Sequence, residues 1–149
     1  MTNGNLKTKL SKHQINILIK SAIQAREKSY SPYSNYMVGA ALLTKNEKIY
    51  QGCNIENAAY GPSNCAERTA FFSAVSSGER EFAAIAITGG KRGGEGDFAY
   101  PCGVCRQVMM EFCDCDTFEV IVAKNENDYV ICTLRELLPN GFGPANLEH

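Results

Sequence analysis

The sequence contains no tryptophan and only two histidines among its 149 residues. His13 falls in a segment with helical spacing, and His149 is the last residue, so neither is well placed to bind a metal. A transition-metal site in this chain would therefore depend on cysteine and carboxylate ligands. Seven cysteines are present to supply them.

An excess of charge of one sign is also missing, since 15 basic and 16 acidic residues give a formal net charge of −1. This balance provides no basic surface for nucleic acid or for an anionic membrane. No stretch approaches the roughly 18 consecutive apolar residues of a membrane-spanning helix. Residues 1–10 are polar and lack the apolar run of a signal peptide. We therefore expect a cytoplasmic protein without nucleic-acid or membrane partners.

A disulfide framework is not expected, because the seven cysteines are an odd number and do not follow a framework spacing. They are interpreted as reduced thiols of a cytosolic protein. The length suits one domain, residues 1–149. The last three residues, Leu147-Glu148-His149, are either native sequence or the start of a purification tag.

The most informative pattern is Cys65-Ala66-Glu67, followed later by Pro101-Cys102-Gly103-Val104-Cys105. Three thiolates can hold Zn²⁺ and leave its fourth coordination position to water, as catalytic zinc sites do. A carboxylate two residues after the first ligand can move protons for that water. The combination C-x-E … P-C-x-x-C is typical of zinc deaminases, whereas C-x-x-C alone also fits redox motifs and zinc ribbons. We expect Cys65, Cys102 and Cys105 to bind one zinc ion per subunit and Glu67 to be catalytic.

Hydrophobic spacing, turn residues and capping patterns predict an α/β fold. Helices are expected at residues 11–28, 65–77 and 102–112, with a short fourth helix that begins at Thr133. Strands are expected at residues 36–43, 48–53, 82–88, 117–123 and 129–133.

The connections between these strands predict the architecture of the sheet. Helices separate the second, third and fourth strands, so these three should be parallel with right-handed crossovers. The last two strands are joined only by residues 124–128, which is too short for a crossover, so they must be antiparallel. We expect a three-layer α/β/α sandwich with one five-stranded mixed sheet.

Both groups of ligands fall at predicted helix N-termini. Ser63 or Asn64 is expected to cap the helix that starts at Cys65, and Pro101 suits the start of the next helix. The free N–H groups and the positive end of the dipole at these places lower the pKa of a cysteine.

Three thiolates on Zn²⁺ leave a net charge of −1, which opposes deprotonation of the bound water. A positive group nearby is therefore expected, and Arg68 and Arg106 each follow closely on a ligand. We expect Arg68 to hydrogen-bond a ligand thiolate and withdraw charge from the cluster. The alternative is that both arginines are solvated helix residues.

Nearly the whole chain resembles the small, homotetrameric cytidine deaminases. The resemblance runs from Tyr30-Ser31-Pro32-Tyr33-Ser34 to Phe142-Gly143-Pro144, through Val38-Gly39-Ala40-Ala41-Leu42, Gly52-Cys53-Asn54-Ile55-Glu56-Asn57-Ala58, Cys65-Ala66-Glu67-Arg68-Thr69-Ala70, Pro101-Cys102-Gly103-Val104-Cys105-Arg106-Gln107 and Glu136-Leu137-Leu138-Pro139. One difference is Tyr36, where these enzymes usually carry phenylalanine. The stretch Gly89 to Ala99 matches no motif in particular.

The resemblance implies zinc-dependent hydrolysis of cytidine and 2′-deoxycytidine to uridine and 2′-deoxyuridine, with release of ammonia, as part of pyrimidine salvage. No organic cofactor is needed. Asn54 and Glu56 would hydrogen-bond the ribose 3′-hydroxyl, since an amide and a carboxylate can together serve one hydroxyl. Tyr36 and Phe142 would flank the base or the sugar, and Ala66 would also contact the substrate.

The same resemblance implies a homotetramer with active sites at the subunit interfaces. Phe142 would reach into the active site of an adjacent subunit, and Tyr60 would lie near the shared boundary. The alternative is that Phe142 packs on the core of its own chain.

Three other functions fit parts of the pattern. A nucleic-acid deaminase would usually have a histidine as first ligand and a helix between its last two strands. A deaminase of cytosine-containing antibiotic nucleosides would share the zinc motif. A zinc-stabilised binding module would need a fourth ligand, such as Cys113 or Cys115, and would have no use for Glu67. Cys113-Asp114-Cys115 is also a candidate second metal site.

Overall fold

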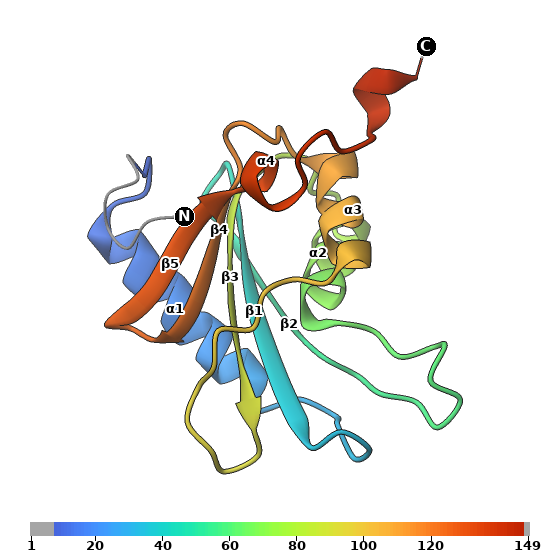
Figure 1. The fold of residues 1–149 in the computed structure, drawn as a ribbon. Helices are drawn as coiled ribbons and strands as arrows, with labels where there is room; N and C mark the ends of the chain where they lie inside the picture. The colour runs from blue at the N-terminus through green and yellow to red at the C-terminus, as the bar shows by residue number, and fades with distance from the viewer. Residues whose placement is uncertain (1–7, 148–149) are drawn as a thin grey trace.

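The computed structural model describes residues 8–147, and Glu148 and His149 of the possible tag lie outside this range. Figure 1 shows the elements in chain order, which are α1 (Lys12–Arg26), β1 (Tyr36–Thr44), β2 (Ile49–Cys53), α2 (Ala66–Ser76), β3 (Phe82–Lys91), α3 (Gly103–Phe112), β4 (Glu119–Asn125), β5 (Asp128–Thr133), α4 (Leu134–Leu137) and the 3₁₀ helix Pro144–Asn146. None of the helices in the described range is long and apolar enough to cross a membrane.

The five strands form one mixed sheet in the order β2-β1-β3-β4-β5. β1 is antiparallel to β2 and to β3, β3 is parallel to β4, and β4 is antiparallel to β5. The predicted mixed sheet with an antiparallel last pair is thus confirmed. β2, β3 and β4 run in the same direction, as expected, but β1 lies between β2 and β3.

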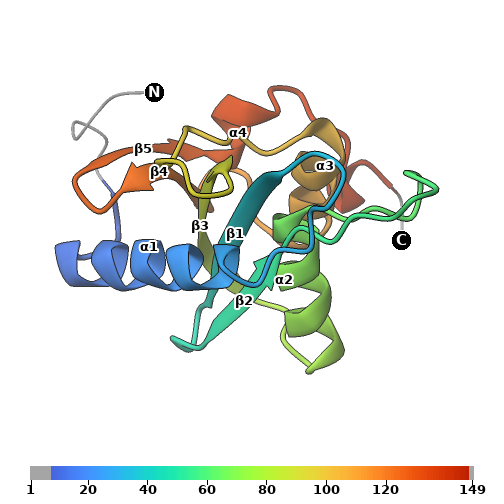
Figure 2. The same ribbon diagram turned by 90° about the horizontal axis from the view of Figure 1, so that it is seen from below.

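The helices cover both faces of the sheet, as the three-layer prediction requires. α1 lies on one face, and α2, α3 and α4 lie on the other (Figures 1 and 2). Successive side chains of a strand point to opposite faces. In β1, Ala40 and Leu42 therefore pack in the core under α2 and α3, while Ala41 and Leu43 pack in the core under α1.

Two glycines let the helices approach the sheet at backbone distance. A Cβ atom on Gly39 of β1 would lie 2.0 Å from the carbonyl oxygen of Ala22 in α1. A Cβ atom on Gly52 of β2 would lie 2.4 Å from the carbonyl oxygen of Ala66 in α2. Because Ala66 opens α2, the contact at Gly52 fixes the helix end that carries Cys65.

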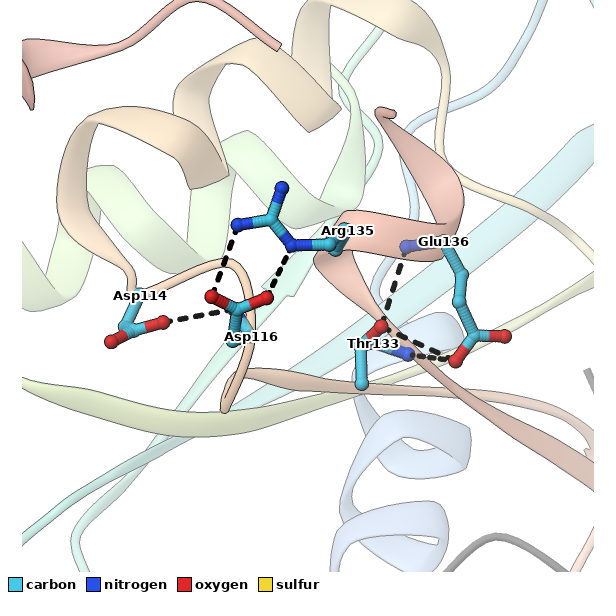
Figure 3. Close-up of polar contacts among 5 residues, drawn as sticks. All are labelled: Asp114, Asp116, Thr133, Arg135 and Glu136. Atoms are coloured by element: carbon cyan, nitrogen blue, oxygen red, sulfur yellow. Dashed lines mark hydrogen bonds and ion pairs between the residues drawn. The ribbon is translucent and has the colours of Figure 1, made fainter. Parts of the chain in front are cut away.

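The N-terminal cap residue was predicted for three helices, and the prediction is confirmed for two of them. Ser11 begins α1 with the expected capping box, and Thr133 and Glu136 form the same arrangement at α4 (Figure 3). The cap predicted for α2 is wrong, because Cys65 itself is the N-cap residue. Ser63 accepts a hydrogen bond from the N–H of Asn57, and the Asn64 amide donates to Thr69.

β3 continues further than the sequence predicts. Its last residues, Gly89 to Lys91, pair with Tyr36 to Val38 at the start of β1. Part of the expected Gly-rich loop is therefore strand. The remaining segment leaves the sheet at Lys91 and leads to α3.

Candidate active site

The three cysteines of the motif come together although they lie on two helices. Cys65 is the N-cap residue of α2, Cys102 is the N-cap residue of α3, and Cys105 lies in the first turn of α3. The Cys102 Sγ is 3.8 Å from the Cys65 Sγ and 3.5 Å from the Cys105 Sγ. Tetrahedral zinc with Zn–S bonds of about 2.3 Å keeps its sulfur ligands about 3.8 Å apart. The donor set and its spacing therefore fit a zinc ion.

The electrostatic surroundings favour thiolate at the first of these positions. A hydrogen bond from Cys105, followed by one from Arg68, lowers the pKa of Cys65 to about 5. The same hydrogen bond to Cys65, together with burial, raises the pKa of Cys105. A metal ion must displace the proton that Cys65 and Cys105 share. The affinity of the site for the metal should therefore rise with pH.

The two arginines near the ligands have different partners. Nη2 of Arg68 donates to Sγ of Cys65 at 3.2 Å, and hydrogen bonds to the sulfurs raise the pKa of its guanidinium. Arg106 instead donates from Nε to the Pro101 carbonyl at 2.7 Å and from Nη1 to the Leu137 carbonyl at 2.6 Å. Arg106 is thus not a solvated helix residue, since it ties the start of α3 to the end of α4.

Glu67 lies in the first turn of α2, beside the cysteines, and is only 4% exposed. Burial raises the pKa of its carboxyl to about 7. A group with a pKa near neutrality can both accept and donate a proton at physiological pH. The position and the pKa of Glu67 are therefore those of an acid–base group.

A cavity of about 480 Å³ opens over these residues, within the size range of small-molecule sites. Residues expected from the sequence line it, namely Tyr36, Asn54, Glu56, Cys65, Ala66, Glu67, Arg68 and Cys102. Ala99 and Tyr100 line it as well. The sequence did not point to these two residues, and their only signal was their place directly before Pro101-Cys102.

Asn54 and Glu56, which both line the cavity, are held by hydrogen bonds. The Asn54 side chain accepts from the Val38 N–H at 2.9 Å and donates to the Tyr36 carbonyl at 2.8 Å. Glu56 accepts from the N–H groups of Tyr33 and Ser34 at 3.0 and 3.1 Å. A further hydrogen bond from the Ser34 hydroxyl is the main cause of the lowered pKa of Glu56. Both polar groups are thus oriented before any ligand binds.

Three predicted residues do not line the cavity of their own chain: Cys105, which is buried beside Cys102, and Phe142 and Tyr60, which are exposed elsewhere. Phe142 is 58% exposed and Tyr60 is 74% exposed. Phe142 therefore does not pack into the core, as the alternative interpretation required. Its carbonyl accepts a hydrogen bond from Gln107 at 2.8 Å.

The second acidic and cysteine cluster lies away from this cavity. Asp114, Cys115 and Asp116 bring one ligand atom each within 4.8 Å of one another, so this group has Asp116 in place of Cys113, which the sequence had offered with Asp114 and Cys115. Figure 3 shows that Arg135 pairs with Asp116, and that the Asp114 carboxylate accepts from the backbone N–H of Asp116. Over residues 8–147, the group formed by Cys65, Cys102 and Cys105 has three members, without Cys113 or Cys115 as a fourth.

Comparisons with known proteins agree with this geometry. The family model of the cytidine and deoxycytidylate deaminase zinc-binding region matches residues 12–124. Cytidine deaminase of Halalkalibacterium halodurans is 50% identical over 126 residues, which cover 85% of this chain and 92% of the relative. The crystal structure of cytidine deaminase from Burkholderia pseudomallei has a TM-score of 0.77 at 48% identity, covering 89% of this chain and 100% of that one. The structure from Mycobacterium tuberculosis has a TM-score of 0.73 at 34% identity, covering 86% and 96%. The chain belongs to the cytidine and deoxycytidylate deaminase family.

Proposed function

We propose that the protein hydrolyses cytidine and 2′-deoxycytidine to uridine and 2′-deoxyuridine with release of ammonia, as an enzyme of pyrimidine salvage in the cytoplasm. The observation that carries the proposal is the placement of buried Glu67 beside three cysteines over one cavity. The relatives named cytidine deaminase support the choice of substrate.

Cys65, Cys102 and Cys105 would hold one zinc ion per chain. When bound, zinc supplies an activated water as nucleophile and positive charge for the oxyanion that develops on attack. The three thiolates would leave the fourth coordination position to that water. Three thiolates on a zinc ion carry one excess negative charge. The hydrogen bond from Arg68 to Cys65 draws part of that negative charge away from the sulfurs.

Glu67 is the proton carrier of the reaction. Its carboxylate takes a proton from the attacking water as the C4–O bond forms, and delivers that proton to N3 of cytosine. It then takes the proton of the new hydroxyl group on C4 and gives it to the 4-amino group, so that the C4–N bond breaks, the C4 carbonyl forms and ammonia leaves. A pKa of about 7 suits a group that must both accept and donate in one cycle.

Asn54 and Glu56 would bind the ribose 3′-hydroxyl, one as donor and the other as acceptor. Their side chains are fixed by the start of β1 and by the turn at Tyr33 and Ser34. Tyr36 and Ala66, which line the same cavity, would contact the nucleoside.

The same proposal includes a homotetramer with shared active sites. Large apolar side chains are exposed at Tyr30, Tyr33, Ile55, Tyr60, Tyr100, Val104 and Phe142. Tyr100 lines the cavity, and the rings of Tyr33 and Tyr60 contact each other with centroids 6.3 Å apart. Exposed apolar side chains that lie together mark interaction surfaces. Figure 1 shows residues 54–64 projecting from the body of the chain beside α2, where they could meet a neighbouring subunit.

The test is the change in ultraviolet absorbance when zinc-loaded protein meets cytidine, with deoxycytidine, cytosine and a single-stranded oligonucleotide in parallel. Turnover of the two nucleosides, and not of the free base or the oligonucleotide, is expected. Turnover of the oligonucleotide alone would contradict the proposal. The Glu67→Gln variant is the matched control, because it keeps the size of the side chain and removes its acid–base function.

A further inference from the structure

One wall of the cavity is made by a segment outside the motifs that carry the family resemblance. This segment, residues 92–100, joins the end of β3 to the start of α3 and contributes Ala99 and Tyr100 to the cavity. Loop residues can form a precise wall only where other parts of the molecule hold them. The question is what holds this loop.

Arg26, the last residue of α1, anchors the loop from the opposite side of the sheet. The residue is only 9% exposed, and its Nη2 donates to the carbonyls of Lys91 at 3.3 Å and of Gly94 at 3.4 Å. Within residues 8–147 the guanidinium forms no ion pair, and its Nε is buried without a partner. A buried cation without a carboxylate partner is costly unless other polar groups solvate it. The carbonyls of Lys91 and Gly94 serve Arg26 in this way, so the contact favours the loop conformation that keeps them within reach.

A backbone hydrogen bond joins the second half of the loop to the end of β3, next to the cavity. The N–H of Asp97 donates to the carbonyl of Gly89 at 2.6 Å. A Cβ atom on Gly89 would lie 2.7 Å from the Cβ of Ala99 and 3.0 Å from the ring of Tyr36. Ala99 thus occupies the space that the missing side chain of Gly89 leaves, next to Tyr36. A shift of the loop would move this wall of the cavity.

Gly90 leaves room for both the loop and the Arg26 guanidinium. A Cβ atom at this position would lie 2.5 Å from the carbonyl oxygen of Glu95 in the loop and 2.6 Å from Nη2 of Arg26. Gly90→Ala would therefore displace the loop backbone itself. This variant is the reference for the effect of a displaced loop on substrate binding.

The start of α3 has an anchor of its own. Arg106 binds the carbonyls of Pro101 and Leu137. Cys102 is therefore held independently of Arg26. Loosening the loop should disturb the wall formed by Ala99 and Tyr100 and leave the metal ligands in place.

We propose that Arg26 is a positioning residue for substrate binding, which orders the 92–100 loop so that Ala99 and Tyr100 form a fixed wall of the nucleoside cavity. The proposal rests on the function proposed above. It assigns Arg26 to the binding of the nucleoside and not to the chemical step.

The experiment compares Arg26→Met, Arg26→Lys and Gly90→Ala with the intact zinc-loaded protein. Lys20→Met is the matched control, because Lys20 lies on the same helix, is exposed, and contacts Glu126 and not the loop. The measurements are KM and kcat for cytidine, zinc content, and the hydrogen-exchange rate of the Asp97 amide.

Arg26→Met should raise KM at least about tenfold, because charge-assisted hydrogen bonds to two carbonyls are lost, and should change kcat less than about twofold. Zinc content should stay unchanged, and the Asp97 amide should exchange faster. Gly90→Ala should act in the same direction, and Arg26→Lys should recover part of the affinity, since an ammonium can still donate to a carbonyl. Lys20→Met should match the intact protein.

An unchanged KM in Arg26→Met, or unchanged exchange at Asp97 in that variant, would overturn the inference, whatever Gly90→Ala does. Cytidine turnover by the intact protein would in that case leave the proposed function standing. A fall in kcat together with loss of zinc would also overturn it, because Arg26 would then act on the metal site. Absence of cytidine turnover by the intact zinc-loaded protein would instead reject the proposed function.

Discussion

Glu67 combines deep burial with the place expected of the proton carrier. Glu67→Gln should keep the fold and the zinc and lower turnover by about 10²- to 10⁴-fold, the usual contribution of a general acid–base group. Cytidine turnover and zinc content measured on one sample are the check. Glu111→Gln, which changes an exposed glutamate on α3, should leave both unchanged. A zinc-loaded Glu67→Gln protein with more than about a tenth of the activity would contradict the role.

The seven cysteines allow the ligand set to be tested within one chain. Cys102→Ala and Cys105→Ala should each lose zinc, because two thiolates and water hold the ion far more weakly than three thiolates. Cys115→Ala should keep it, since Cys115 lies in the separate cluster with Asp114 and Asp116. Metal analysis of the purified variants decides. Zinc that stays stoichiometric without Cys102, or that is lost with Cys115, would show that the ligand set is wrong.

Arg68 should set the pH range of activity through its hydrogen bond to Cys65. Arg68→Gln leaves more negative charge on the thiolates, which raises the pKa of the attacking water. The positive charge of Arg68 also lowers the pKa of Glu67, so its loss acts in the same direction. The acidic limb of the kcat/KM profile should therefore move to higher pH, with zinc retained. Arg80→Gln, an exposed residue beyond the other end of α2, is the control, and an unchanged limb in Arg68→Gln would refute this role.

At the scale of the elements, local signals predicted more than long-range ones. α1 and α4 begin where their capping boxes place them, because a cap depends on residues three apart in the sequence. The cap of α2 was predicted wrongly because three candidates stand side by side: Ser63 and Asn64 use their side chains on Asn57 and Thr69, and Cys65 takes the N-cap position. The insertion of β1 between β2 and β3 depends on pairing between residues some 50 apart, such as Val38 with Gly89, which no local pattern encodes.

The close contact between α1 and β1 gives a prediction at this scale. Gly39→Ala should destabilise the fold by about 1–3 kcal/mol or more, the usual cost of overpacking, because its Cβ would overlap the backbone of α1 at Ala22 and Arg26. Thermal or denaturant unfolding measures the change. Gly61→Ala is the matched control, since the nearest atom to its Cβ would be 4.0 Å away. Equal stability of the two variants would mean that α1 can move away from the sheet without cost.

At the scale of the whole molecule, the sequence predicted the chemical groups of the site better than its walls. Cys65, Cys102 and Glu67 are recognisable because metal and proton chemistry restrict residue type and spacing. Ala99 and Tyr100 are not, because any residue of suitable shape can form a wall and only the folded loop brings these two to the cavity. The walls that another subunit would contribute lie beyond any one chain.

The exposed ring of Phe142 is the observation from which the assembly can be tested. We expect a tetramer of 16.3 kDa chains, in which Phe142 of one subunit closes the cavity of its neighbour. Phe142→Ala should then raise KM for cytidine by roughly 10- to 150-fold, since burying a phenylalanine side chain is worth roughly 1.5–3 kcal/mol. Loss of this ring should leave zinc content unchanged, because Phe142 is not a member of the cysteine group.

Mixing the variants distinguishes a shared site from a site within one chain. Phe142→Ala subunits keep Glu67, and Glu67→Gln subunits keep Phe142, so a hybrid tetramer contains sites in which the two intact residues meet across the interface. Such sites should recover the KM of the unaltered protein, although neither parent variant has it. If Phe142 acted within its own chain, every active site of the hybrid would lack it and KM would stay high. Sedimentation as an active monomer, or hybrids without recovery, would reject the shared site.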